Sequence, residues 1–369
     1  MASGLSLREQ MLVGLRPNRP YALKVYVNRA LRPNDAPRCF CNNNVSHLER
    51  PSSAMPRHFR FFLAILALLV AMAVSTALGA KVMDWSHPDW HLIWVSRVPR
   101  TFAIVLVGAS LSVAGLVMQL AVHNRFVEPN TAGTAQGAML GIVTTTLLVP
   151  HWPLLANMAV AAGCAFASIL GFLAIARRIP PQDPLLLPLV GLIYGSIIGS
   201  AAFFFAYQYD ALQLLTTWVS GDFSGVLRGR YELLWLGGAI ACLVYWFADR
   251  LTIIGMGEQM SKSLGLPYRQ LVLLAMAAVS LMTALVAITV GSIAFLGLVM
   301  PNIVRRFSGD NLRRSLPWVA WLGALLLLVA DVIARWVRYP YEVPVSTVFG
   351  IIGAALFFYL LLKPVRHAD

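Results

Sequence analysis

One pair of ionisable residues lies in a long apolar run of the sequence, where burying a charge costs free energy. Asp331 is the one acid well inside a long apolar run of the sequence, and Arg335 follows it by four residues. Residues four apart share one face of a helix, so these two side chains can form an ion pair. An ionisable group in such a run is also a candidate proton or substrate site. We favour the ion pair, because a proton-coupled carrier usually needs more than one such acid.

Arginines also occur in pairs at the ends of two apolar runs. Arg97 and Arg100 open one run, and Arg335 and Arg338 close another. A guanidinium group can bind a carboxylate through two parallel hydrogen bonds, so paired arginines suit an acidic partner or an anionic ligand. The same residues could instead anchor helix ends at lipid headgroups, and both interpretations stay open.

Recognisable catalytic and metal-binding motifs are absent from the sequence. We find no P-loop, G-x-S-x-G, H-E-x-x-H or C-x-x-C. Cys39, Cys41 and His47 offer three loose candidates where zinc requires about four ligands at suitable spacing. Cys164 and Cys242 lie inside apolar runs and are expected to be small core residues. The sequence therefore predicts no catalytic, cofactor or metal site, and no ATP hydrolysis by this chain.

The elements that must carry these residues are unusually apolar. Of the 369 residues, 58% are hydrophobic and 12% are charged, and the mean hydropathy is +0.70. A soluble domain has about 25% charged residues and could not hide this much apolar surface. The net charge of +13 comes from basic residues that mostly flank apolar runs, which indicates membrane topology rather than nucleic acid binding. These features exclude a cytosolic enzyme and predict an all-α polytopic membrane protein that contacts lipid.

Long apolar runs divide the chain into candidate membrane spans. About 20 apolar residues cross a bilayer core of about 30 Å. By this measure the chain has ten spans, at residues 59–80, 101–121, 130–150, 153–176, 186–207, 231–249, 271–290, 293–307, 317–335 and 344–362. The third and eighth are rich in Gly, Thr or Pro, which is tolerated where protein rather than lipid surrounds the backbone. We therefore expect these two helices to be buried or broken.

Lysine and arginine in the connections predict the orientation. Placing residue 55 in the cytoplasm puts fourteen basic residues on the inner side and seven on the outer side. Cytoplasmic loops carry the excess of Lys and Arg, so we expect a bacterial inner-membrane protein with both termini in the cytoplasm. An even number of spans also requires both termini to lie on the same side of the membrane. The inner connection at about 250–270 is polar and contains a helical pattern stopped by Gly265 and Pro267.

Residues 1–54 differ from the rest of the chain. They are basic, contain scattered Pro and Asn, and have no apolar run near 18 residues long. Met55 is followed at once by the first span, which is how a bacterial inner-membrane protein commonly begins. We expect residues 1–54 to be a disordered extension or a mis-assigned start, with a small ordered cap as the alternative. Residues 55–369 are expected to form the ten-helix transmembrane domain.

Small residues recur at helical spacing in several spans. Such rows let two helices approach closely, and they are also compatible with a pathway lining. The residues in question are Gly108, Gly115, Gly133, Gly137, Gly141, Gly191 and Gly195.

Four groups of motifs, in order and at the expected spacings, carry a family resemblance. The first runs from Arg97-Val-Pro-Arg-Thr101 to Asn124-Arg-Phe-Val-Glu-Pro129. The others are Gly257-Glu-Gln-Met-Ser-Lys-Ser-Leu-Gly265, Phe295-Leu-Gly-Leu-Val-Met-Pro-Asn-Ile-Val-Arg305, and Ala330-Asp-Val-Ile-Ala-Arg335 with Glu342-Val-Pro344. Over about residues 59–365 the chain thereby resembles the FecCD family, the permease subunits of type II ABC importers for iron-siderophores, haem and vitamin B12.

The resemblance implies a fold and a set of partners. Family members have ten helices per subunit and pair two permease subunits, identical or homologous, above two ATPase subunits. A periplasmic or lipoprotein substrate-binding protein delivers the ligand to the outer face. Motif position assigns docking of that protein to Arg97, Arg100 and Arg335. It assigns coupling to the ATPase to Glu258, Ser263, Leu264 and Gly265.

The resemblance also implies a function. The chain would be a non-catalytic permease for a ferric siderophore, closest to catecholate-type permeases, with ATP used by the partner ATPase and no cofactor in this chain. Vitamin B12 or haem is the alternative cargo. An ion-coupled secondary transporter would need acids at the membrane midplane, where the sequence offers only Asp331. An integral membrane enzyme would need clustered His or acidic residues, which we do not find.

Overall fold

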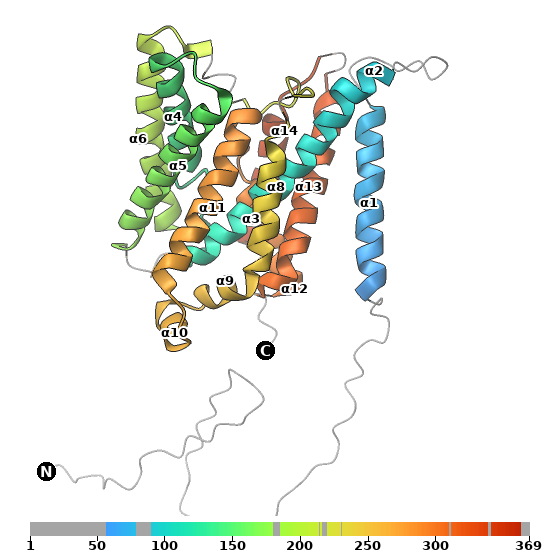
Figure 1. Cartoon of the computed structure of the whole chain (residues 1–369). Coiled ribbons are helices and arrows are strands. Elements are labelled where there is room, and N and C mark those ends of the chain that lie inside the picture. Colours follow the sequence, from blue (N-terminus) through green and yellow to red (C-terminus); the bar gives the residue numbers. More distant parts are fainter. Residues whose placement is uncertain are drawn as a thin grey trace, which may run out of the picture. The chain divides into compact units, whose positions relative to one another are not determined.

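The computed structural model describes most of the apolar part of the chain. The described residues are 57–78, 90–179, 185–213, 215, 220–229, 231–309, 311–338 and 341–362. Every regular element within these ranges is a helix (Figure 1). The predicted extension 1–54 lies outside the described residues.

Each of the ten predicted spans coincides with a helix. These are α1 (Arg57–Ala77), α3 (Val98–Ala121), α4 (Thr134–Leu148), α5 (Leu154–Ala176), α6 (Leu186–Gln208), α8 (Leu234–Trp246), α11 (Tyr268–Thr289), α12 (Leu296–Ser308), α13 (Leu312–Trp336) and α14 (Val345–Leu362). Among the described helices, six are long and apolar enough to cross a membrane, or seven if the bent pair α8 and α9 (Ala248–Ile254) is one span. The all-α polytopic membrane fold is therefore confirmed.

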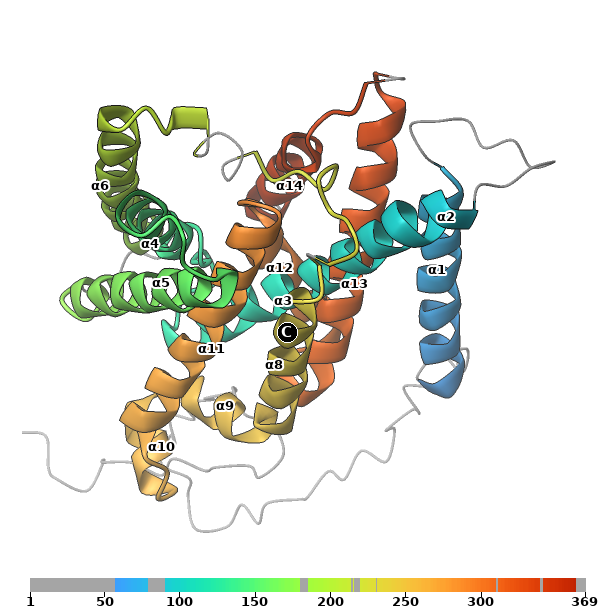
Figure 2. The same cartoon turned by 45° about the horizontal axis from the view of Figure 1, so that its top comes forward.

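Helix α3 is the element against which most of the others pack. Its first turn continues from α2 (Trp90–Leu92) and a π-helical turn, η1 (Ile93–Arg97), so that an apolar helix runs over Ile93–Ala121. In the most apolar part of that helix, 78% of the residues are buried. Figures 1 and 2 show α3 crossing the bundle obliquely, beside α11 and α13. A helix buried on all sides fits its nearly unbroken apolar sequence.

Two glycine pairs set the close crossings of α3. A Cβ atom added at Gly115 would lie 2.0 Å from the carbonyl oxygen of Gly297 on α12. One added at Gly108 would lie 2.6 Å from the carbonyl oxygen of Gly323 on α13. Neither distance leaves room for a side chain, so the two backbones are in direct contact. The structure thus places Gly108 and Gly115 at helix crossings rather than along an open surface.

Helices α4, α5 and α6 lie side by side in both views (Figures 1 and 2), and glycines again line their contacts. Gly137 and Gly141 on α4 face Ser168 and Ala161 on α5, respectively. On α6, a Cβ atom at Gly191 would lie 2.3 Å from the carbonyl oxygen of Thr131, and one at Gly195 would lie 3.3 Å from the Cα of Gly133. Gly133 itself precedes α4 with φ of +75°, a backbone conformation that glycine adopts without strain.

The chain breaks between α11 and α12, which explains why the eighth span is weak in the sequence. Phe295 precedes α12 with φ of +66°, and its backbone N–H donates to Glu128 Oε1 at 3.0 Å. Asn130 Nδ2 donates to the carbonyl oxygen of Ile293 at 2.7 Å. Glu128 is buried, and its carboxylate satisfies a donor at the positive end of α12. Polar side chains of the 122–133 connection thus replace hydrogen bonds that the break removes.

The polar connection after α8 folds back sharply. α8 and α9 meet at a bend of 69°, and the short helix α10 (Glu258–Ser263) follows. Gly265 then has φ of +73°, so the predicted helical pattern and its glycine stop are both present. Ser261 is buried and donates to the carbonyl oxygen of Ile253 at 3.1 Å, which ties α10 to α9.

Candidate functional site

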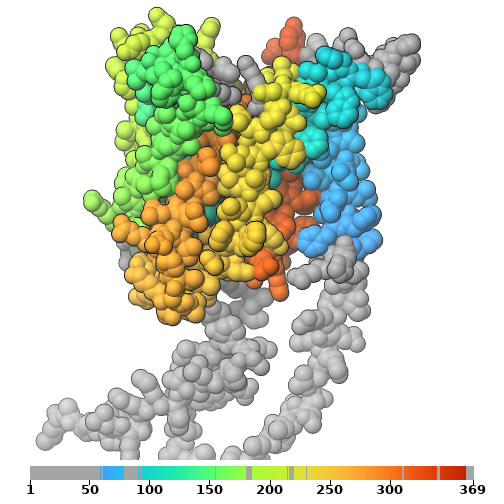
Figure 3. All heavy atoms as spheres, viewed as in Figure 1, coloured from blue at the N-terminus to red at the C-terminus, as the bar shows by residue number. Residues whose placement is uncertain are grey.

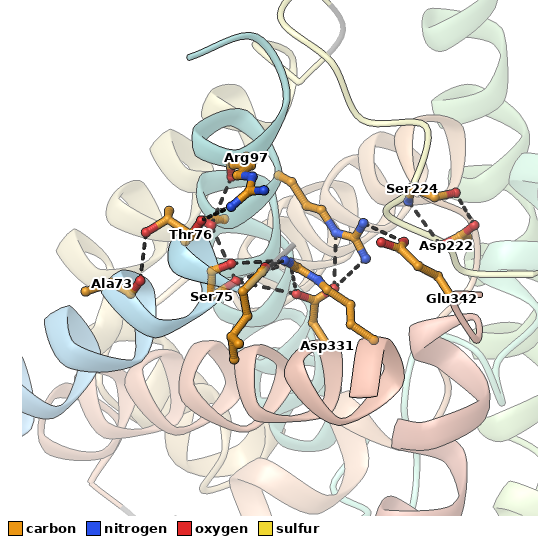
Figure 4. A network of polar contacts seen from close by, with 12 residues as sticks. Ala73, Ser75, Thr76, Arg97, Asp222, Ser224, Asp331 and Glu342 are labelled. Atoms are coloured by element: carbon orange, nitrogen blue, oxygen red, sulfur yellow. Dashed lines mark hydrogen bonds and ion pairs between the residues drawn. The ribbon is translucent and has the colours of Figure 1, made fainter. Parts of the chain in front are cut away.

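A cluster of buried polar side chains joins the end of α1, the start of α3, the end of α13 and the connection before α14 (Figure 4). We call it the arginine cluster. Its members are Ser75, Arg97, Arg100, Thr101, Asp331, Arg335 and Glu342.

Asp331 lies at the centre of the arginine cluster and is completely buried. Its Oδ1 accepts from Arg100 Nη2 at 2.8 Å and from Arg100 Nε at 3.2 Å. Its Oδ2 pairs with Arg335 Nη2 and accepts from Ser75 Oγ at 3.4 Å. The i, i+4 pair within α13 is therefore present, and it is extended by a second arginine from α3.

Glu342 forms the outer edge of the cluster. Its Oε2 accepts from Arg100 Nη1 at 2.6 Å, so Arg100 bridges two carboxylates. The Glu342 side chain is 20% exposed, whereas the side chains of Arg100 and Arg335 are 9% and 7% exposed. Glu342 is thus the carboxylate of the cluster that solvent, or another protein, can reach.

Further donors of Arg97 and Arg335 face the end of α1. Arg97 Nη1 donates to the carbonyl oxygens of Thr76 at 3.3 Å and Ala77 at 3.0 Å. Arg335 Nη1 donates to the carbonyl oxygen of Ser75 at 2.9 Å. The last carbonyls of a helix lack partners within that helix and carry a partial negative charge, so guanidinium groups are suitable caps.

The charges of the cluster do not cancel. Among the described residues of the cluster, the guanidinium groups of Arg97, Arg100 and Arg335 outnumber the carboxylates of Asp331 and Glu342, so these residues together carry a net charge of 3 − 2 = +1. Arg338 lies outside the arginine cluster, with its guanidinium carbon 5.9 Å from the centre of the Tyr341 ring. The cluster is therefore a slightly positive, mostly buried patch with one accessible acid.

A second candidate site lies on the connection that contains α10. Glu258 and Lys262 form an exposed ion pair of 2.7 Å, and the hydrogen bond and charge of Lys262 lower the pKa of Glu258. Leu264 is 58% exposed, and Ser263 and Gly265 are exposed beside it. Figure 3 shows this orange region at the lower end of the molecule, uncovered in that view. An apolar side chain held out among charges is typical of a contact with a partner protein.

Metal ligands do not gather in the described part of the chain. No group of three or more His, Cys, Asp or Glu that could hold a metal ion is found there. Cys39, Cys41 and His47 lie outside the described residues. Cys164 is half-buried, but Cys242 is exposed on α8, so the expectation that Cys242 is a core residue is wrong. Its position inside an apolar run does not distinguish a lipid-facing surface from a protein core.

Comparison with known proteins identifies the family. A model of the FecCD transport family matches residues 58–363. This chain belongs to the FecCD transport family. The FecCD protein is 42% identical over 313 residues to the petrobactin import system permease protein YclN of Bacillus subtilis (strain 168), covering 85% of this chain and 99% of that one.

Other relatives of this FecCD protein differ in the cargo that their names give. The ferric-anguibactin transport system permease protein FatD of Vibrio anguillarum is 39% identical, covering 83% of this chain and 99% of that one. The vitamin B12 import system permease protein BtuC of Salmonella arizonae is 35% identical, covering 84% and 96%. A solved inward-facing conformation of a metal-chelate type ABC transporter has a TM-score of 0.71 at 23% identity, covering 83% of this chain and all of that one. That likeness supports the fold.

Sequence reasoning on this FecCD protein found part of the arginine cluster and missed the rest. The pair of Asp331 and Arg335 follows from helical spacing within α13. The contacts of Arg100 with Asp331 and Glu342 join residues 231 and 242 positions apart, which no local pattern reveals. The structural role of Glu128 at the start of α12 was also missed, although an acid between apolar residues and before a proline was a signal that its side chain must find partners.

Proposed function

We propose that this chain is the permease subunit of an ATP-driven importer that moves a ferric siderophore across a bacterial inner membrane into the cytoplasm. The observation that carries the proposal is its likeness to siderophore permeases. Three relatives named for petrobactin or anguibactin are 37–42% identical over 82–85% of this chain, against 35% for the vitamin B12 permease of Salmonella arizonae. We therefore take a ferric siderophore as the cargo and vitamin B12 as the alternative.

The proposed assembly follows from the division of labour in such an importer. This chain pairs with a second permease subunit, identical or homologous, and both rest on two ATPase subunits that hydrolyse ATP. The exposed α10 region, with Glu258, Ser263, Leu264 and Gly265, is the proposed contact with the ATPase. Closing of the ATPases would move this contact and rock the helices packed against it, which is alternating access by rigid-body motion.

The arginine cluster is the proposed contact with an outer substrate-binding protein. A net positive charge suits carboxylates on that partner, and Arg97, Arg100 and Arg335 supply it. The excess of Lys and Arg on the opposite side of the spans supports cytoplasmic termini, and in that orientation the cluster would lie at the outer face.

The geometry of Asp331 argues against coupling to an ion gradient. A proton-carrying acid needs access to water during the cycle, whereas Asp331 is completely buried and both of its carboxylate oxygens are bound by guanidinium groups. The acid that the sequence offered to a secondary transporter is thus held in ion pairs.

Transport by the purified complex tests this mechanism. We expect proteoliposomes containing both permease subunits, the ATPases and the binding protein to take up radioactive ferric petrobactin or ferric anguibactin only when ATP reaches the ATPases. A protonophore should leave the rate unchanged. Uptake that proceeds without ATP and is abolished by the protonophore would contradict the proposal and support an ion-coupled carrier.

A further inference from the structure

The contacts of Arg100 are divided between two carboxylates of different accessibility. Asp331 binds the Nε and Nη2 edge of the guanidinium from a completely buried position, and it also binds Arg335. Glu342 binds Nη1 from a position that is 20% exposed. Figure 4 shows Glu342 beyond Asp331, on the segment that leads to α14. Asp331 therefore orients the two arginines, and Glu342 binds the one guanidinium nitrogen of Arg100, Nη1, that Asp331 does not bind.

We propose that Glu342 is a built-in competitor for docking, and that a carboxylate of the substrate-binding protein replaces it on Arg100. This inference rests on the proposed function of the arginine cluster. Three observations support the exchange. Arg100 is already satisfied in the structure, so an incoming carboxylate must displace an existing partner. Asp331 cannot leave without stranding two buried charges. Glu342 can turn outward into water.

The backbone around Glu342 allows the side chain to leave while the loop stays in place. Glu342 lies outside regular helix, between α13 and α14. Its neighbours are held by backbone hydrogen bonds: the N–H of Val343 donates to the carbonyl oxygen of Ala334 on α13 at 3.2 Å, and the N–H of Tyr341 donates to the carbonyl oxygen of Arg338, just after α13, at 2.8 Å. Displacement therefore requires only a rotation of the Glu342 side chain, which costs little compared with moving a helix.

The exchange also changes the charge that a partner meets. When Glu342 turns outward, one negative charge leaves Arg100, so the guanidinium groups of Arg100 and Arg335 then face Asp331 alone. Glu342 therefore weakens docking in the resting protein. Moderate affinity is useful in a delivery step, because the empty binding protein must leave before the next one docks.

Titration of the permease–ATPase complex in nanodiscs with the substrate-binding protein of the same transport system tests the exchange. We expect Glu342→Gln to lower the dissociation constant by about two- to five-fold, because the amide competes for Arg100 less strongly than the carboxylate. Arg100→Lys should raise it, because an ammonium group cannot bind both Asp331 and the partner as the planar guanidinium does. Glu232→Gln is the matched control: Glu232 is an exposed acid bound to the backbone N–H of Gly229 at 2.8 Å, and its loss should change nothing.

The pattern of results separates the two levels of the proposal. Tighter binding with Glu342→Gln, weaker binding with Arg100→Lys and no effect of Glu232→Gln support the exchange. Unchanged or weaker binding with Glu342→Gln, while Arg100→Lys still weakens it, overturns the exchange and leaves docking at the cluster intact. No effect of Arg100→Lys overturns docking at Arg100 and the exchange with it.

Discussion

Asp331→Asn is expected to destabilise the folded protein by about 3–5 kcal/mol, because it leaves two buried guanidinium groups without their shared carboxylate. The change is nearly isosteric, so it creates no cavity and isolates the electrostatic effect. Arg100 would keep Glu342, but Arg335 would keep only carbonyl and hydroxyl partners at the end of α1. The midpoint of heat-induced loss of monodisperse protein in detergent, measured by size-exclusion chromatography, should fall sharply.

Asp249→Asn is the matched control for this variant. Asp249 pairs with Arg313 at 2.6 Å, but the two side chains are 62% and 61% exposed. An exposed pair contributes at most about 1 kcal/mol, since water already solvates both charges. We therefore expect Asp249→Asn to leave the midpoint almost unchanged. If Asp331→Asn lowers the midpoint no more than Asp249→Asn does, the arginine cluster does not stabilise the fold.

Gly115→Ala is expected to prevent α3 and α12 from packing, at a cost of about 3 kcal/mol or more. The added methyl group would lie 2.0 Å from the carbonyl oxygen and 2.3 Å from the Cα of Gly297. Both are backbone atoms of a helix, so no side-chain rotation relieves the clash. The yield of monodisperse protein should fall, because the buried helix α3 would have to separate from its neighbour.

Gly163→Ala makes the same chemical change where space is open. Gly163 lies inside α5, and nothing within 4 Å would meet its Cβ atom. Alanine has a higher helix propensity than glycine, by about 1 kcal/mol, so this variant should be as stable as the unmodified protein or slightly more so. If the yields of the Gly115 and Gly163 variants are equal, the close crossing at Gly297 is not a constraint on the fold.

The spans could be predicted from the sequence because the bilayer imposes a local requirement on length and hydropathy. Every predicted span overlaps an observed helix, including the weak eighth one. The sequence did not reveal the π-helical turn before α3 or the bend of 69° between α8 and α9, because both depend on the helices packed around them. The buried carboxylate that supports the start of α12 comes from Glu128, far away in the chain.

The arginine cluster shows the same limit at the level of side chains. Arg97, Arg100 and Arg335 were expected to face a partner at the outer surface. In the structure all three are buried, with only 6–8% of the surface of each whole residue exposed. Asp331 and Glu342 are the acids that bind Arg100. The pairing of Asp331 with Arg335 could be predicted from helical spacing, whereas the contact of Glu342 with Arg100 depends on the tertiary structure. The docking role remains a proposal, and burial changes its form: a partner must compete for guanidinium groups that already have carboxylate partners.

Uptake of radioactive iron by iron-starved cells with and without this gene is the most direct test of the central claim. The cells are offered ferric petrobactin, ferric anguibactin and other ferric chelates one at a time, with labelled vitamin B12 as the comparison. We expect deletion to abolish uptake of one class of ferric siderophore and to leave vitamin B12 uptake unchanged. Unchanged uptake of every ferric chelate, together with lost uptake of vitamin B12, would contradict the assignment of a ferric siderophore as cargo.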